Sequence, residues 1–224
     1  MGLFTLTLDD GSAVATSRLI LAGGQVDVPL DVPGMAQRWG SSVLHCPFCH
    51  GWETTGRSLA VINNGMEAML AAYVRDRFSE DVVLCTNGPS TVPAPAAAIL
   101  TNLGVTVRET PIAAVEGELD ALTLRFTDGS TLERDAIYHR APTRPGNDLA
   151  AQLGAELLPD GYILVDEFGR TTVDGVSAVG DSARLAALSD ALTLVGPGAA
   201  DGVRAAVWME QELFRSGLTV ATVS

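Results

Sequence analysis

The sequence predicts an α/β fold in which helices flank a parallel sheet. Residues 58–62 and 81–86 are continuous apolar runs, which is the composition of strands buried on both faces. Between them, residues 66–78 carry apolar side chains at helical spacing, and the connecting loops are short. Strand–helix–strand units with short loops build parallel sheets. Alternating segments around Asp-Gly turns add β-hairpin regions.

The first forty residues are predicted to be mainly β structure. Residues 4–16 alternate with period two around an Asp-Asp-Gly-Ser turn, which is typical of a hairpin. Residues 19–22 form an apolar run that two glycines stop, as in a buried strand. The segment 25–40 contains two prolines, and we expect it to be a connector.

The later elements follow from the same patterns of spacing and turn residues. In chain order we expect a helix at 95–103, a short strand at 105–107, a hairpin region at 119–126 and 131–137, a helix at 148–153, a strand at 162–166, an apolar segment at 176–179 and a terminal helix at 200–215 that Gly196-Pro197-Gly198 opens.

Composition excludes several function classes. The net charge is −13, so a surface that neutralises nucleic-acid phosphates is not expected. All 14 basic residues are arginine, which excludes Schiff-base chemistry and a P-loop lysine. No apolar run is long enough to cross a bilayer, and no basic residue precedes the apolar start as in a secretory signal. We therefore expect a cytoplasmic protein without membrane contact, and the arginine-rich, lysine-free composition favours a bacterial source.

The nine residues from His45 to Glu53 contain the strongest candidate site. They include two thiols, Cys46 and Cys49, and two imidazoles, His45 and His50. In a reducing cytosol three cysteines are too few for a disulfide scaffold, so a close pair is expected to be catalytic or metal-binding. Pro47 suits the first turn of a helix, whose positive end would lower a thiolate pKa.

Other interpretations of this motif remain open. The cysteines could be an inert, vestigial pair, or could bind zinc together with histidines, although four ligands from so short a segment fit a tetrahedron poorly. A c-type haem matches Cys-x-x-Cys-His but requires export. We predict no metal site. Cys85 ends an apolar strand and is expected to be a small buried hydrophobe, His139 to lie at the surface or at a hinge, and Trp52 and Glu53 to pack and cap.

Several segments together resemble the thioredoxin-reductase-like pyridine nucleotide-disulfide oxidoreductases. The segments are Leu21-Ala22-Gly23-Gly24, Cys46-Pro47-Phe48-Cys49-His50-Gly51, the turn at 61–68, and 166–181 ending in Gly180-Asp181. The Cys-Pro-x-Cys-His-Gly form is similar to that of the gliotoxin-type dithiol oxidases. The resemblance implies a Rossmann-like three-layer NAD(P)H-type domain at 43–140, and the remnant of a truncated FAD-type domain at 1–42 and 141–224.

The resemblance also implies roles for individual residues. Cys46 and Cys49 would be the redox pair, with His50 as the acid/base and His45 stabilising a thiolate. Gly65 and Ala68 would approach a nicotinamide dinucleotide, and Gly180 and Asp181 the flavin. Asp181 can equally be a simple helix N-cap.

The departures from the family pattern weaken every cofactor motif. The family's first GxGxxG segment would precede residue 1. Asn63 replaces the first glycine of the second nucleotide loop, and we expect it to keep the turn at positive φ. Residues 86–89, which follow the third predicted strand, contain no arginine to bind a 2′-phosphate. We therefore do not expect NADP, and expect either no tightly bound cofactor or an FAD shared with a partner.

Two functions follow. The first is a dithiol–disulfide oxidoreductase that acts on a small-molecule substrate or a protein thiol through Cys46 and Cys49. The second is a cofactor-free scaffold that binds a small molecule in the old cofactor cleft for a cyclisation, an isomerisation or a regulatory role. Because loss of a central strand would expose sheet edges, we expect a homo-oligomer or a partner chain that completes the sheet.

Overall fold

The computed structural model describes residues 3–221 and divides the chain into two compact units. Unit 1 contains Met1–Val26 and Thr143–Ser224, and unit 2 is Asp27–Pro142. Residues 27–42 therefore belong to unit 2, whereas the sequence analysis grouped them with the outer segments. The physical reason is that Val32 and Met35 are buried in the core of unit 2.

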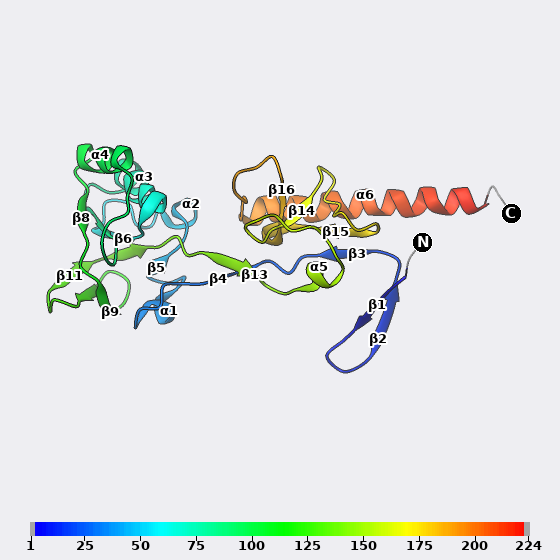
Figure 1. Cartoon of the computed structure of the whole chain (residues 1–224), viewed down its shortest axis with the longest axis horizontal. Coiled ribbons are helices and arrows are strands. Elements are labelled where there is room, and N and C mark those ends of the chain that lie inside the picture. Colours follow the sequence, from blue (N-terminus) through cyan, green and yellow to red (C-terminus); the bar gives the residue numbers. More distant parts are fainter. Residues whose placement is uncertain (1–2, 222–224) are drawn as a thin grey trace. The chain divides into compact units, whose positions relative to one another are not determined.

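Unit 2 is built on a five-stranded sheet in which every strand pair is parallel (Figure 1). The strand order is β5 (Val43–Leu44), β12 (Ala136–Tyr138), β6 (Leu59–Ile62), β7 (Val82–Cys85) and β8 (Thr106–Arg108). The apolar runs that predicted β6 and β7 are both fully buried, which confirms those two strands.

Side chains on successive residues of β6 enter different layers. Leu59 and Val61 pack with the helices α3 (Met69–Arg77) and α4 (Ala94–Asn102). Ala60 and Ile62 pack on the opposite side, against a second sheet. That sheet is antiparallel, with the order β11 (Thr131–Arg134), β10 (Leu122–Phe126) and β9 (Ile112–Glu116). The period-two alternation thus produces the three layers that the fold class requires.

Unit 1 contains four two-stranded sheets. Its antiparallel hairpin, β1 (Phe4–Thr7) with β2 (Ala13–Thr16), extends away from the rest of the unit (Figure 1). The other pairs are β3 (Leu19–Leu21) with β15 (Val176–Ala178), β14 (Ile163–Val165) with β16 (Ala183–Leu185), and β4 (Gln25–Asp27) with β13 (Thr143–Pro145). The last residue of β4, Asp27, already belongs to unit 2. The helical elements of the unit are α5 (Leu149–Gln152), the 3₁₀ turn η2 (Gly180–Ser182) and α6 (Val195–Ala221).

Three sequence expectations differ from the structure. The connector 25–40 holds β4 and a short helix α1 (Met35–Arg38). The terminal helix begins at Val195, five residues before the expected start, because Gly-Pro-Gly is tolerated within its first turn. The predicted hairpin arm 131–137 is broken at Asp135, whose carboxylate accepts hydrogen bonds from the backbone N–H and the hydroxyl of Ser58. The residues after Asp135 therefore join the parallel sheet as β12.

Surface composition adds two observations. Within the described residues, no helix combines the length and the apolar composition needed to cross a bilayer.

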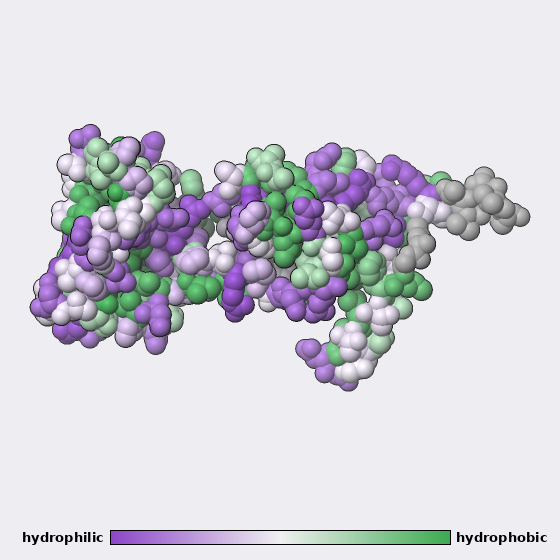
Figure 2. All heavy atoms as spheres, viewed as in Figure 1, coloured by the Kyte–Doolittle hydropathy of each residue, from purple (hydrophilic) through white to green (hydrophobic). Residues whose placement is uncertain are grey.

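On α6, Val203, Val207 and Phe214 have exposed fractions of 66%, 50% and 62%. Figure 2 shows hydrophobic side chains interspersed with hydrophilic ones over this surface.

Candidate active site around Cys46 and Cys49

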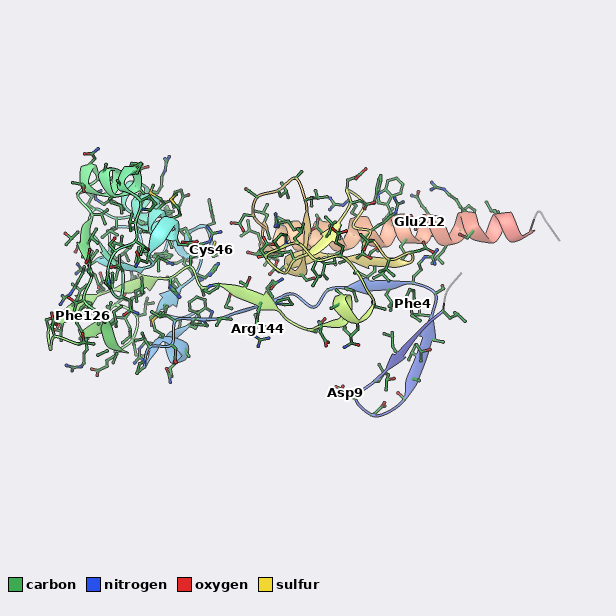
Figure 3. The ribbon with its side chains drawn as sticks, viewed as in Figure 1. Phe4, Asp9, Cys46, Phe126, Arg144 and Glu212 are labelled. Atoms are coloured by element: carbon green, nitrogen blue, oxygen red, sulfur yellow. The ribbon has the colours of Figure 1, made fainter. Side chains whose placement is uncertain are left out.

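The two cysteines lie on a single helical turn at the surface of unit 2. Cys46 is the N-cap of α2 (Pro47–His50), and Pro47 occupies the first helical position, as the sequence predicted (Figure 3). The backbone N–H groups of Cys49 and His50 both donate to the Cys46 carbonyl oxygen at 3.2 Å. Both cysteines are free thiols, with Cys46 half-buried and Cys49 exposed. The turn therefore holds both sulfur atoms where a small reagent can reach them.

The two thiols lie close enough for Cys46 to act on the ionisation of Cys49. Hydrogen bonding to the Cys46 side chain is the largest cause that raises the pKa of Cys49 to about 11, followed by burial and by the charges of Cys46 and Glu53. The sequence analysis expected the helix N-terminus to lower a thiolate pKa, and for Cys49 this expectation is wrong. A helix of one turn has a weak dipole, and the neighbouring sulfur and Glu53 both oppose a charge on Cys49.

Gly51 fits α2 closely against the rest of unit 2. A Cβ atom at this position would overlap the Phe78 ring and the Pro47 carbonyl oxygen. The backbone of Gly51 has ordinary helical dihedrals (φ −63°, ψ −35°), so glycine is required here by space and not by conformation. Phe78 stacks edge-on against Tyr73, which in turn contacts the ring of Phe48 at 5.7 Å. Gly51 therefore lets α2 pack directly against the aromatic cluster of Tyr73 and Phe78.

A buried pair of hydroxyl groups holds the other end of α2. Thr54 is 2% exposed, and its Oγ1 lies 3.0 Å from the His50 carbonyl oxygen and 2.8 Å from the Tyr138 hydroxyl. Tyr138 is fully buried on β12. Burial is the main reason that the pKa of Tyr138 is raised, and the charges of Glu53, Cys46 and Cys49 add to it. Tyr138 therefore stays a neutral hydroxyl close to the cysteine pair.

Exposed aromatic side chains flank the cysteines. Phe48, between the two cysteines in sequence, is 75% exposed, and Trp52 is 88% exposed. The expectation that Trp52 packs is therefore not met within unit 2, where its ring is exposed. The residue lies four positions after Phe48, and helical hydrogen bonds continue past α2, so the two rings occupy the same side of this turn. Such exposed rings are typical of a binding surface.

The three histidines have different surroundings. His139 is 6% exposed, so of the two expected positions, at the surface or at a hinge, the surface one is wrong. Its Nε2 accepts a hydrogen bond from the Leu30 backbone N–H at 3.3 Å, and its Nδ1 donates to the Ile62 carbonyl oxygen at 2.6 Å. Burial is the main cause that lowers the pKa of His139, so the ring stays neutral.

His45 and His50 lie at the two ends of the motif. The ring of His45 packs edge-on against Trp39, with centroids 6.0 Å apart, and its buried Nδ1 has no hydrogen-bond partner among the described residues. His50 is the last residue of α2 and is half-buried. Their proposed roles toward the thiols stay predictions. In the described part of the chain, no cluster of three or more His, Cys, Asp or Glu side chains is arranged for a metal ion.

The nucleotide-type loop after β6 is held by asparagine side chains. Asn63 has no positive φ, contrary to the expectation for it. Its amide instead forms two hydrogen bonds to the backbone of Arg140, at 3.0 and 3.3 Å. The Asn64 Oδ1 accepts from the backbone N–H groups of Gly65 at 2.9 Å and of Thr91 at 2.8 Å. The Asn64 Nδ2 donates to the Pro89 carbonyl oxygen at 3.0 Å.

This loop leads into a 3₁₀ turn, η1 (Gly65–Ala68), before α3 begins. Gly65 has a φ of 59°, which favours glycine, and a carboxylate oxygen of Glu67 lies 3.5 Å from where its Cβ would be. Ala68 is fully buried in the core and faces no solvent. The Gly65 N–H that a pyrophosphate would need is thus already bonded within the loop, and a carboxylate lies beside it.

Unit 1 contains a cavity of about 490 Å³. Gly23, Gly24, Gln25 and Ser182 are among the residues that line it. The buried Nε2 of Gln25 has no hydrogen-bond partner among the described residues, so a ligand could accept a bond from it. The predicted flavin residues Gly180 and Asp181 precede Ser182 in η2. Asp181 lies within that turn and is not its N-cap, because Val179 caps it.

Sequence reasoning missed the residues that support α2 from a distance. Thr54 and Tyr138 are 84 positions apart, and neither belongs to a recognisable motif. Asn63 was noted only as a substitution, whereas its partner Arg140 lies 77 positions away. Within the motif, the Gly51 contact with Phe78 depends on a residue 27 positions later. No local sequence pattern predicts any of these pairings.

These features define a dithiol-bearing member of a nucleotide-type α/β class, and comparison with known proteins identifies the family. The family model described as pyridine nucleotide-disulphide oxidoreductase matches residues 2–210, so the chain belongs to this family. It is thioredoxin-reductase-like. Thioredoxin reductase tcpT of Claviceps purpurea is 33% identical over 190 residues, which cover 80% of this chain and 59% of that protein. Thioredoxin reductase sirT of Leptosphaeria maculans is 30% identical, with 80% and 60% covered.

A solved structure agrees with this assignment. The crystal structure of HlmI matches with a TM-score of 0.89 and 31% identity, covering 98% of this chain and 67% of that one. The predicted family and the α/β fold class are thereby confirmed. The chain spans about 60% of the length of the two curated relatives. Both of those relatives come from fungi, so they give no support to the bacterial source expected from composition.

Proposed function

We propose that the protein is a dithiol–disulfide oxidoreductase that acts on small molecules through Cys46 and Cys49. The observation that carries this proposal is a pair of free thiols on one accessible four-residue turn, close enough for Cys46 to raise the pKa of Cys49. Because Cys49 keeps its proton up to about pH 11, the attacking sulfur at neutral pH is Cys46. The pair then exchanges two electrons with its substrate in two steps.

In the first step the Cys46 thiolate attacks one sulfur of a substrate disulfide, forms a mixed disulfide and releases one substrate thiolate. In the second step Cys49 loses its proton and attacks the Cys46 sulfur, which releases the other substrate thiolate. The products are a Cys46–Cys49 disulfide and a substrate dithiol. The reverse sequence oxidises a dithiol substrate to its disulfide and reduces the cysteine pair.

The surroundings of the thiols favour an apolar substrate. Phe48 and Trp52 offer exposed rings beside Cys49. The charge of Glu53 acts on Cys49 and would repel an anionic disulfide as it approaches. A neutral aromatic probe such as 4,4′-dithiodipyridine fits this surface, whereas the anionic glutathione disulfide does not.

The nicotinamide loop supports a reaction without NADPH. The side chains of Asn63 and Asn64 already accept hydrogen bonds from the backbone N–H groups of Arg140 and Gly65. The Glu67 carboxylate lies beside Gly65 and would repel a pyrophosphate there. We therefore expect no binding of NADPH up to millimolar concentration, measured by quenching of its fluorescence, and no NADPH oxidation in the presence of 4,4′-dithiodipyridine. Saturable NADPH binding by the wild-type protein would contradict this prediction.

A flavin is not needed for thiol exchange. The residues of unit 1 fit one part of an FAD molecule, because glycines line the cavity and Gln25 offers a free donor. In this proposal Gly180 and Asp181 lie at the flavin side and a second chain completes the site. The exposed apolar side chains of α6 support an association of this kind, either with a second copy or with another protein.

The cavity of unit 1 also supports a second function, in which the protein is a cofactor-free scaffold for a non-redox step on a small molecule. Its volume lies within the usual range of small-molecule sites, about 300–1,000 Å³. The two functions respond differently to substitution. A scaffold activity would survive Cys46→Ser with Cys49→Ser and be lost in Ala151→Trp, which narrows the cavity.

The proposed exchange is tested by mixing the reduced protein with 4,4′-dithiodipyridine and following the absorbance of the released thiopyridone. We expect two thiopyridones per chain and a protein that has lost the two thiols of Cys46 and Cys49, by mass spectrometry after alkylation. Release of thiopyridone without formation of the Cys46–Cys49 disulfide would contradict the proposed function.

A further inference from the structure

The Tyr138 and Thr54 hydroxyl groups connect the cysteine turn to the parallel sheet. The Thr54 side chain has a single hydrogen to donate, and the nearest carbonyl oxygen is that of His50 at 3.0 Å, ahead of Gly51 at 3.3 Å. Its oxygen is then free to accept the hydrogen of Tyr138 at 2.8 Å. The resulting chain runs from β12 through Tyr138 and Thr54 to the last turn of α2.

Burial makes this connection stronger than a surface hydrogen bond. Tyr138 is fully buried and Thr54 is 2% exposed, so water does not replace either partner if the bond is lost. Tyr138 packs with Leu44 and Leu59 in the helix-side core, which fixes its ring. The position of the hydroxyl is therefore determined by the sheet, and the position of Thr54 follows from it.

The same hydroxyl lies within electrostatic reach of the reacting groups. The charges of Glu53, Cys46 and Cys49 each act on Tyr138. The anchor thus holds the turn that carries both thiols against β12. Because α2 has only four residues, loss of the anchor would loosen this turn and let the spacing of the two sulfurs vary.

We propose that Tyr138 and Thr54 are positioning residues that hold the turn of Cys46 and Cys49 in one conformation, and so favour closure of their disulfide. This inference rests on the proposed function for its biological meaning. Closing a disulfide requires the two sulfurs to be held near bonding geometry, and loss of the anchor loosens that arrangement. Neither residue touches the substrate in this proposal.

The test uses Tyr138→Phe, which removes one hydroxyl and keeps the ring. We expect the equilibrium constant for forming the Cys46–Cys49 disulfide against glutathione to fall about tenfold, because a looser turn lowers the effective concentration of one sulfur at the other. Free thiols are counted by alkylation and mass spectrometry at several ratios of reduced to oxidised glutathione. Tyr73→Phe is the matched control, because Tyr73 makes ring contacts with Phe48 and Phe78 on the same face of the unit, and it should titrate as the wild type does.

A second pair of variants separates positioning from stability. Thr54→Ser keeps the hydroxyl and should behave as wild type, whereas Thr54→Val keeps the size and should titrate like Tyr138→Phe. If Tyr138→Phe and Thr54→Val lower the melting temperature but leave the glutathione titration unchanged, the positioning role is overturned and the proposed function is not affected. A wild-type protein that never forms the disulfide would overturn the proposed function as well.

Discussion

Cys46→Ser is expected to lower the rate of exchange with 4,4′-dithiodipyridine at least about tenfold at pH 7.5. The remaining thiol in the turn, Cys49, then lacks the side chain and the charge of Cys46, which raise its pKa in the wild type, whereas burial and the charge of Glu53 still raise it. Only a small fraction of Cys49 is therefore thiolate at this pH. Its intrinsic nucleophilicity recovers only part of the lost rate. Stopped-flow absorbance measures the rate directly.

The pH dependence of this variant provides an independent check. Below its pKa, the thiolate fraction of Cys49 grows about tenfold for each pH unit, so the residual rate should rise about tenfold between pH 7 and pH 8. Cys49→Ser should instead react once and stop as a mixed disulfide on Cys46. Cys85→Ala is the control, because Cys85 is fully buried and burial raises its pKa to about 12. Full activity in Cys46→Ser, with none in Cys49→Ser, would reverse the assigned roles.

The parts of the fold that were predictable from sequence are those whose signal is local. The apolar runs of β6 and β7 and the helical spacing of α3 and α4 each lie within one short window, and the structure confirms them. The strand β12 was missed because Asp135 ends the preceding strand through a bond to Ser58, 77 positions earlier. Hydrophobic periodicity cannot report such a pairing, since it describes the faces of one element only.

The candidate site likewise contains features that the sequence predicts and features that it does not. The cysteine pair and Pro47 are visible in sequence because the motif is contiguous, and Cys85 was correctly predicted to be a buried hydrophobe. Asn63 was interpreted through its backbone, by analogy with glycine, whereas the structure uses its side-chain amide to bind Arg140. Glu53 was assigned a packing role, yet its charge acts on Cys49. Such roles depend on partners that only folding brings together.

Gly51→Ala is expected to be the most disruptive single methyl addition in the motif. The new Cβ would overlap the Phe78 ring and the Pro47 carbonyl oxygen, and the carbonyl belongs to the backbone of α2 itself. Overpacking of this kind costs about 1–3 kcal/mol. Relief of the overlap must move α2, which carries both thiols, so the exchange rate should fall together with the free energy of unfolding. Urea denaturation and thiopyridone release measure the two effects.

Gly202→Ala is the matched control, because it adds the same methyl group where no steric conflict arises. Gly202 lies within α6, and its Cβ position has no neighbouring atom within 4 Å. Gly202→Ala should therefore stabilise the helix by up to about 1 kcal/mol through propensity alone and leave exchange unchanged. Adding Phe78→Leu to Gly51→Ala removes the ring edge and should recover part of the stability, while the Pro47 carbonyl prevents full recovery. An unchanged free energy of unfolding in Gly51→Ala would show that α2 is not held against Phe78, and the close approach that explains this glycine would have to be abandoned.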